Sequence, residues 1–418
     1  MKTRKRKRIL LAALLVTVAS CGGGGGGGSS SSATTPTTTT TVTSTSAYDS
    51  LGNIIWRDSS RTYNSSDPHN KSSVTAYTGS GVEVGIIDLG YNTTNAGLKA
   101  DISSKFDSSR YNHISTSNEA TTENHGILVA EMVGGNTSNG IAKGVILNVV
   151  DAAKKGSDND IVVEPTRAMY DALESAGSTI YNQSFGGDIV SDYTSSTYAG
   201  AIGSNILSFY KTGVSKGYLF VWAAGNESSD TQPSLEAALP YFDSSLEAGW
   251  INVVGLTKKD SNGDLSWSNL TPYSPAGVAA NWTVSAIADH TVTLTDTSDS
   301  TKKANWSISG SSFAAPVVTG TAALIKEKYP WMDGSLLRQT ILSTATDIGA
   351  EGVDDKFGWG LLDIGKAING PSQFLKRLAL ADNVTVNVTT GVYTFSNDIS
   401  GDAGIIKNGA GTLILSGD

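Results

Sequence analysis

Five short runs rich in β-branched and aromatic residues, separated by helix-like stretches, constrain the fold of this chain more than any other feature. They read VEVGIID (82–88), VILNVVDA (145–152), STIYNQSFG (178–186), YLFVWAAGN (218–226) and INVVGLT (251–257). Continuous apolar runs of this length are typical of strands that are buried on both faces. Their alternation with helices predicts an α/β fold, in which a parallel sheet carries helices on both faces. Functional residues are then expected at the carboxyl ends of the strands.

The first 47 residues indicate a targeting signal and a tether rather than part of a fold. The apolar run Ile9 to Val18 follows a basic stretch and has about half the length that spans a bilayer, so residues 1–21 are expected to be a secretory signal. Its end, VASC, resembles the lipobox of bacterial lipoproteins, which implies acylation of Cys21. Residues 22–47 are rich in Gly, Ser and Thr and cannot bury apolar surface, so they are expected to form a flexible tether.

The overall composition excludes several classes of protein. The 418 residues include 30 basic and 39 acidic side chains, and the net charge of −9 argues against a general nucleic-acid binder. Cys21 is the only cysteine, so no intramolecular disulfide and no cysteine-based zinc site can form. With 39% hydrophobic residues, the chain can nevertheless bury a large core.

An aspartate, a histidine and a pair of serines, which together can carry out acyl transfer, occur at the expected ends of a strand and of two helices. Asp88 ends the first strand-like run, and His125, one of four histidines, begins an apolar helical stretch. The segment GSSFAAP (310–316) places two adjacent serines at the start of a further apolar helix, although a simple Gly-Ser helix cap is the favoured explanation of this segment when it is taken alone. No histidine follows Ser312, which excludes the Ser-acid-His order of α/β-hydrolases. The order Asp88, His125, Ser312 instead fits the Asp-His-Ser arrangement found on a parallel sheet.

Several blocks of sequence resemble those of subtilisin-like (subtilase, S8) serine proteases. YTGSGVEVGIIDLGY is similar to the family's Asp block, NHGILVAEMVGG to its His block and SGSSFAAPVVTGTAAL to its Ser block. In this register Ser312 matches the nucleophile, and Ser311 takes the place of a usual threonine. The resemblance implies that AAGN places Asn226 at the oxyanion position. It also implies seven substrate-lining residues on two segments: Ser184, Phe185, Gly186, Gly187, Ala223, Ala224 and Gly225.

The resemblance implies a serine endopeptidase that hydrolyses peptide bonds through an acyl-enzyme intermediate. Such chemistry requires no cofactor, and no metal site is predicted, while a structural calcium ion is left open. The expected partners are polypeptide substrates, with no nucleic acid, and the expected state is a monomer attached to a membrane through a lipid anchor on Cys21. The expected location is the bacterial surface or outer membrane, with release from the cell as a further possibility. A surface adhesin that uses the same fold only as a scaffold is the rival interpretation.

The chain is expected to contain two folded parts, a peptidase domain over residues 48–370 and a β-rich segment over residues 371–418. The second part alternates apolar and polar residues with glycine between them, as solenoid strands do. Its end, GIIKNGAGTLILSGD, resembles the passenger-associated repeat of bacterial autotransporters; a lone Gly-rich hairpin is the alternative. We expect a β-strand repeat or β-solenoid to begin here, as in a truncated passenger.

Overall fold

The computed structural model describes residues 47–48, 54–55, 67–91, 98–99, 105–116, 124–155, 161–227, 229–257, 270–296 and 303–417. The expected signal with Cys21 and nearly all of the expected tether lie outside these residues. Among the helices that the structure describes, none combines the length and the hydropathy needed to cross a bilayer.

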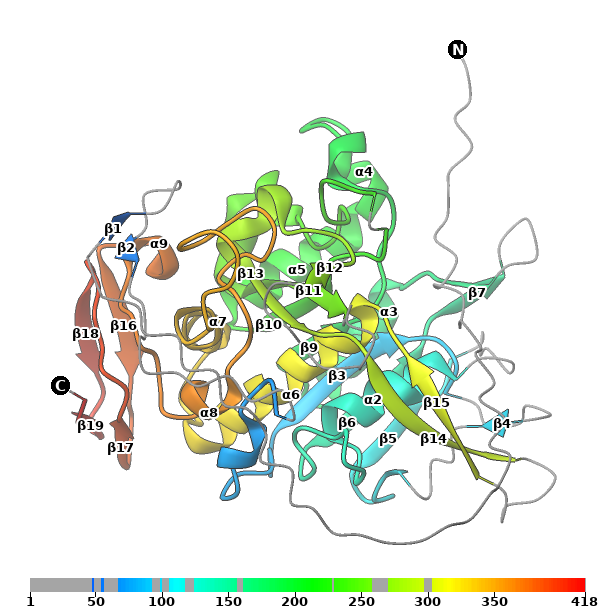
Figure 1. Cartoon of the computed structure of the whole chain (residues 1–418), viewed down its shortest axis with the longest axis horizontal. Coiled ribbons are helices and arrows are strands. Elements are labelled where there is room, and N and C mark those ends of the chain that lie inside the picture. The colour runs from blue at the N-terminus through cyan, green and yellow to red at the C-terminus, as the bar shows by residue number, and fades with distance from the viewer. Residues whose placement is uncertain are drawn as a thin grey trace, which may run out of the picture.

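An eight-stranded sheet forms the centre of the molecule, in the order β12-β11-β10-β9-β3-β6-β5, with β13 paired to β11 (Figure 1). All neighbouring strands run parallel except β12, which is antiparallel to β11. The predicted parallel sheet is therefore confirmed, and the five strand-like runs of the sequence correspond to β3, β6, β9, β10 and β11. The strands are β3 (Glu83–Asp88), β5 (Tyr111–Ile114), β6 (Ile146–Asp151), β9 (Ile180–Gln183), β10 (Leu219–Ala223), β11 (Trp250–Thr257), β12 (Thr271–Pro272) and β13 (Thr283–Ile287).

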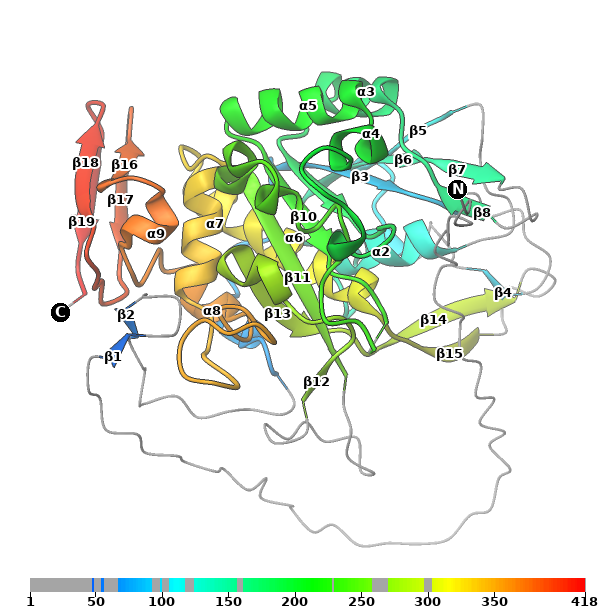
Figure 2. The same ribbon diagram turned by 90° about the horizontal axis from the view of Figure 1, so that it is seen from above.

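Helices cover both faces of this sheet, as Figure 2 shows from above. Alternate residues of one strand serve the two faces: Ile86 of β3 packs into a core with α2 and α6, whereas Ile87 packs into a second core with α3 and α5. The predicted placement of helices on both faces is thus confirmed. The helices are α2 (His125–Gly134), α3 (Arg167–Ser175), α4 (Tyr198–Ile202), α5 (Ser204–Ser215), α6 (Ser311–Lys328), α7 (Gly334–Ser343), α8 (Ile364–Ala367) and α9 (Lys376–Ala379).

Small sheets surround the central one. A hairpin of β14 (His290–Asp296) and β15 (Lys303–Ile308) pairs with β4 (Leu98–Lys99), and β7 (Ala153–Lys155) pairs with β8 (Ile161–Val163). Near the start of the described chain, β1 (Ala47–Tyr48) pairs with β2 (Ile54–Ile55).

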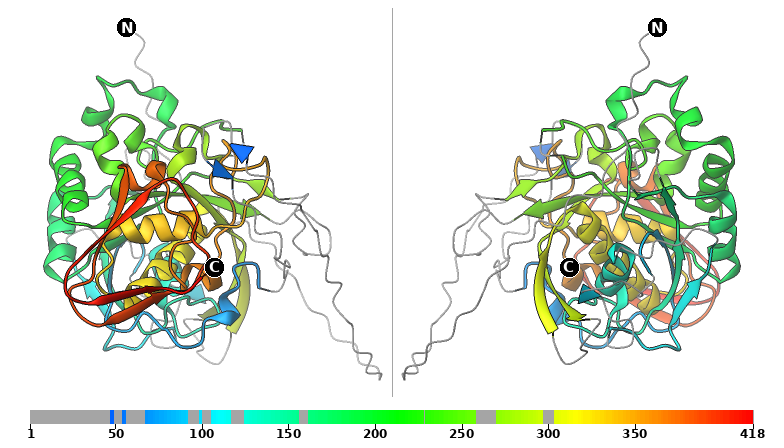
Figure 3. Two further views of the ribbon diagram at one scale, coloured as in Figure 1. Left: turned by 90° about the vertical axis from the view of Figure 1, so that its left-hand side faces the viewer. Right: turned by 90° about the vertical axis from the view of Figure 1, so that its right-hand side faces the viewer.

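Four short strands after α9 stack beside α7 and α9, and the left panel of Figure 3 faces them. β16 (Asn383–Asn387) runs parallel to β18 (Gly404–Asn408), and β17 (Val392–Phe395) runs parallel to β19 (Thr412–Leu415). Buried Phe395 packs its ring 5.3 Å from that of Tyr329, which follows α6, and the Tyr329 hydroxyl donates to the Thr394 carbonyl at 2.7 Å. These strands therefore pack directly on the core that contains α2 and α6, and the interpretation of residues 371–418 as the start of a solenoid stays a prediction.

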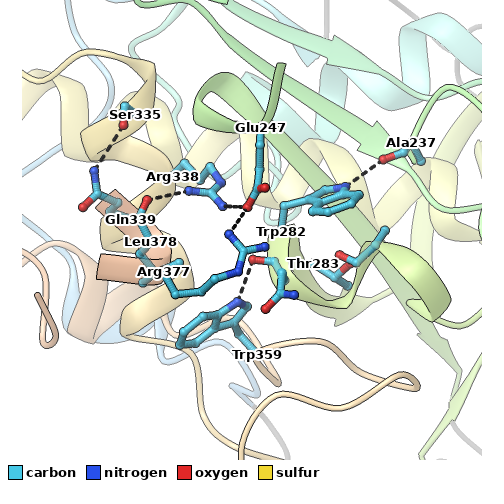
Figure 4. Close-up of polar contacts among 12 residues, drawn as sticks. Ala237, Glu247, Trp282, Thr283, Ser335, Arg338, Gln339, Trp359, Arg377 and Leu378 are labelled. Carbon is cyan, nitrogen blue, oxygen red and sulfur yellow. Dashed lines mark hydrogen bonds and ion pairs between the residues drawn. The ribbon is translucent and has the colours of Figure 1, made fainter. Parts of the chain in front are cut away.

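A buried cluster of three charged side chains holds α9 to the rest of the molecule (Figure 4). Glu247 accepts from Arg338 of α7 at 2.8 Å and from Arg377 of α9 at 2.5 Å. Arg338 also donates to the carbonyl of Leu378 at 2.9 Å. Because the two arginines come from segments far apart in the sequence, the cluster ties the C-terminal strands to the helix layer.

Candidate active site

The end of β3 and the start of α2 bring the predicted acid and base together. Asp88 is the last residue of β3 and is fully buried, and its Oδ1 lies 2.7 Å from Nδ1 of His125, the first residue of α2. The two elements are joined directly, since the Gly126 N–H donates to the Leu89 carbonyl at 2.7 Å. Asp88 can therefore hold the imidazole in one orientation.

A glycine is required after His125 because an aromatic ring occupies the place of a side chain. A Cβ on Gly126 would lie 2.6 Å from the ring of Tyr91, which is almost fully buried. The packing of Tyr91 against the helix backbone therefore sets how closely α2 approaches the end of β3.

The predicted nucleophile lies in the first turn of α6. Gly310 precedes this helix with a φ of 125°, a conformation that side chains rarely adopt. The Ser312 hydroxyl donates to the Ser184 carbonyl at 3.1 Å, and the Ser184 hydroxyl donates to the Ser312 carbonyl at 2.8 Å. The ring of Phe313, the residue after Ser312, lies 5.3 Å from that of His125, so the first turn of α6 packs beside the start of α2. Among the described contacts the Ser312 hydroxyl bonds to this carbonyl and not to the imidazole.

Asn226 is held by the residue just before the predicted nucleophile. Its Oδ1 accepts from the Ser311 N–H at 2.7 Å and from the Ser311 hydroxyl at 2.9 Å. The Ser311 hydroxyl in turn accepts from the Gly225 N–H at 3.2 Å. With its oxygen fixed in this way, the carboxamide can only use its NH₂ group to donate to a third partner. The sequence alone gave no indication of this role of Ser311.

The seven predicted substrate-lining residues lie on two neighbouring segments. Ser184 to Gly187 directly follow β9, and Ala223 to Gly225 include the last residue of β10 and the two after it. A third segment, which sequence reasoning missed, joins them: the Ser234 N–H donates to the Ala224 carbonyl at 2.8 Å, and the Leu235 N–H donates to the Asp188 carbonyl at 2.9 Å. No strand-like or helix-like pattern marked this loop in the sequence.

The lining contains close contacts that only glycine permits. A Cβ on Gly186 would lie 2.9 Å from both Cβ and Oγ of Ser234, and a Cβ on Gly225 would lie 2.8 Å from Oγ of Ser274. Phe185 packs edge-on against Trp222 of β10 at 5.4 Å between ring centres. Elsewhere in the described residues, no group of three or more His, Cys, Asp or Glu side chains is arranged to hold a metal ion.

Comparison with known proteins identifies the family. The model of the Subtilase family, peptidase S8, matches residues 79–360. This chain belongs to the subtilase family. The region that matches this family of serine proteases contains Asp88, His125 and Ser312, together with Asn226 and the two predicted substrate-lining segments.

Curated relatives and a solved structure agree with this assignment. The Neisserial autotransporter lipoprotein NalP of Neisseria meningitidis is 32% identical over 418 residues, which cover 82% of this chain and 37% of the relative. An extracellular serine protease of Serratia marcescens is 29% identical over 250 residues, which cover 48% of this chain and 23% of that protein. The chain thus spans well under half the length of both relatives. Fervidolysin from Fervidobacterium pennivorans shares the fold, with a TM-score of 0.53 at 18% identity over 74% of this chain and 46% of its own.

Proposed function

We propose that Asp88, His125 and Ser312 form the catalytic triad of this subtilase. Ser312 attacks the scissile carbonyl, and His125 takes its proton and returns it to the leaving amine. Asp88 keeps the imidazole in the tautomer that presents Nε2 to the serine, and it stabilises the imidazolium. The observation that carries this proposal is the 2.7 Å contact between Asp88 and His125, with Ser312 beside the ring that packs on His125. Hydrogen bonds of catalytic groups are often loose without substrate, so the contact of Ser312 with Ser184 is compatible with this role.

Asn226 is the proposed oxyanion donor, together with the backbone N–H of Ser312. The N-terminus of α6 adds the positive end of a helix dipole at the same place. Since Ser311 fixes the amide oxygen of Asn226, its NH₂ group is oriented before substrate arrives. The substrate backbone is proposed to add as a strand along Ser184 to Gly187 and Ala223 to Gly225.

The triad is tested by labelling with a fluorophosphonate probe and by casein digestion. Ser312→Ala is expected to abolish both, whereas Ser311→Thr, which keeps the hydroxyl that holds Asn226, is the matched control and is expected to stay active. Label on Ser311 would contradict the assignment of the nucleophile. A folded wild-type chain that neither takes up the label nor digests casein would favour the adhesin interpretation instead.

A lipid anchor on Cys21 is proposed to hold the protein at the bacterial surface or outer membrane. The lipobox-like VASC and the tether after it support this, and so does the name of the NalP relative, an autotransporter lipoprotein. Several acyl chains on one residue would attach the protein stably, whereas one would not. Cells fed an alkynyl fatty acid should yield labelled wild-type protein and unlabelled Cys21→Ala. Unlabelled wild-type protein whose N-terminus lies beyond Cys21 would contradict the proposal.

The proposed substrates are polypeptides at this location, which include surface proteins, the chain itself and host proteins. The proposed division of the chain is a peptidase domain over residues 48–370 and a passenger-like β-segment over residues 371–418. A proteomic profile of cleavage sites, with Ser312→Ala as the control, would identify the natural targets. Cleavage products that are equally abundant in both samples would exclude the assigned targets.

A further inference from the structure

The loop that joins the two substrate-lining segments carries an acidic side chain at the wall of the proposed substrate site. The Ile189 and Ser234 backbones form an antiparallel bridge, and the Val190 N–H donates to the Pro233 carbonyl at 3.0 Å. With the bonds of Ser234 to Ala224 and of Leu235 to Asp188, residues 233–235 are tied to both segments. Glu236 is the next residue along this loop.

The Glu236 carboxylate lies against the glycines of the lining. Its Oε2 accepts from the Gly187 N–H at 2.9 Å. A Cβ on Gly187 would lie 3.3 Å from its Oε1, and a Cβ on Gly186 would lie 3.5 Å from its Oε2. Because neither glycine has a side chain, the Glu236 carboxylate lies directly against the backbone of these two substrate-lining residues.

The charge of Glu236 has no basic partner among the residues that the structure describes. It is half-buried, and none of the Lys, Arg or His side chains in the described part of the chain pairs with it. Burial raises the pKa of Glu236, the Gly187 N–H lowers it, and nearby Asp188 raises it further. Asp188 itself accepts from the hydroxyl of Tyr193 at 3.0 Å. A partly desolvated carboxylate beside a second carboxylate is stabilised when a cation from outside binds next to it.

We propose that Glu236 makes this protease prefer a basic residue, Lys or Arg, at the position just before the cleaved bond. This inference rests on the proposed function, since it places the first specificity pocket between Ser184 to Gly187 and Ala223 to Gly225. The ammonium or guanidinium group of the substrate meets the half-buried Glu236 carboxylate and forms a charge-assisted hydrogen bond with it. Glu236 determines specificity and takes no part in the chemical step.

The test compares kcat/KM of the 418-residue chain on fluorogenic peptides that differ at this one position. Lys and norleucine form the central pair, because they share the same four-carbon chain and differ in the terminal ammonium group. The wild type is expected to favour Lys over norleucine by about 10- to 100-fold. Glu236→Gln, which still offers an oxygen to the Gly187 N–H, should bring this ratio close to one. Glu164→Gln, an exposed acid paired with Lys154, is the matched control and should keep the wild-type ratio.

Two outcomes would overturn the inference and leave the proposed function intact. One is a wild type that cleaves the norleucine peptide as fast as the Lys peptide, and the other is a Glu236→Gln variant that keeps the Lys preference. In both cases fluorophosphonate labelling of Ser312 would still proceed. A chain that takes up no label and cleaves none of the peptides would overturn both proposals together. Labelling of Glu236→Gln at the wild-type rate shows that the variant is folded.

Discussion

Replacing Glu247 by glutamine is expected to destabilise the folded chain by about 3–5 kcal/mol, because the change leaves a buried positive charge without its counter-ion. The carboxylate serves two guanidinium groups, and glutamine keeps its size while removing its charge. Arg338 would then hold a full charge next to a neutral amide. Since folded domains are stable by about 5–15 kcal/mol, a loss of this size is a large part of the total.

The structure ranks the contributions of the three side chains. The side chain of Arg338 is 0% exposed and that of Glu247 is 9% exposed, whereas that of Arg377 is 30% exposed. Burial lowers the pKa of Arg338 to about 10, with Glu247 raising it and Arg377 lowering it. Arg377→Ala removes the better solvated arginine and leaves Arg338 and Glu247 as a neutral pair, so it should cost about 1 kcal/mol or less.

Urea unfolding, followed by tryptophan fluorescence and circular dichroism, measures these differences. All variants carry Ser312→Ala, which prevents self-digestion during the experiment. Lys211→Met breaks the surface pair with Asp243, in which the lysine is 48% exposed, and serves as the control with an expected loss below about 1 kcal/mol. A loss for Glu247→Gln no larger than that for Lys211→Met would refute the reasoning about buried charge.

Three further predictions concern the site. Asn226→Ala should lower kcat about 10²- to 10³-fold with KM nearly unchanged. This is the loss known for removal of the corresponding oxyanion donor in a subtilisin, which is a member of this family. A wild-type kcat in the folded variant would remove Asn226 from the mechanism. Ser311→Ala should lower kcat because Asn226 loses its hydroxyl partner, while Ser311→Thr should keep most of the activity. Equal steady-state rates for the two variants would exclude a role of the Ser311 hydroxyl in positioning Asn226. Because the pKa of Glu236 is raised above its usual 4.5, the folded state binds the Glu236 proton more tightly than the unfolded state. The contribution of this proton to stability is therefore present at low pH and is lost as the pH rises through the raised pKa. Glu236→Gln should flatten that part of the urea-unfolding pH profile, and a profile identical to that of the wild type would contradict this prediction.

The sheet was predictable because its strands are buried on both faces. Runs such as YLFVWAAGN have no polar alternation, so their only stable place is a central strand, which β10 confirms. The antiparallel β12 was not predictable, since Thr271 and Pro272 form a strand of two residues without a pattern of their own. The packing of β16 to β19 against Tyr329 also left no signal, because contacts between aromatic residues distant in sequence depend on the tertiary fold.

The places of the candidate site residues were predictable where a residue ends or begins an element, and not where it lies in a loop. Asp88 ends a strand and His125 begins a helix, so their places followed from the pattern of the elements around them. Ser311 and Glu236 act through hydrogen bonds to residues distant in sequence, namely Asn226 and Gly187. Only the folded chain brings these partners together, and a Ser in a Gly-Ser loop or a Glu in a polar loop has no distinguishing sequence pattern.

The connection between β10 and β11 carries both Glu236 and Glu247, yet separate contacts hold the two. Trp250 donates its indole N–H to the Glu236 carbonyl at 3.1 Å, and Trp282 donates to the Ala237 carbonyl at 3.1 Å, as Figure 4 shows for the second pair. Both tryptophans are buried in the core on the α3 and α5 side of the sheet. The wall of the proposed substrate site is therefore anchored to that core, whereas Glu247 is anchored to α7 and α9. Loosening the C-terminal strands through Glu247 should accordingly lower stability without changing the preference for a basic residue, because the anchors of Glu236 remain in place.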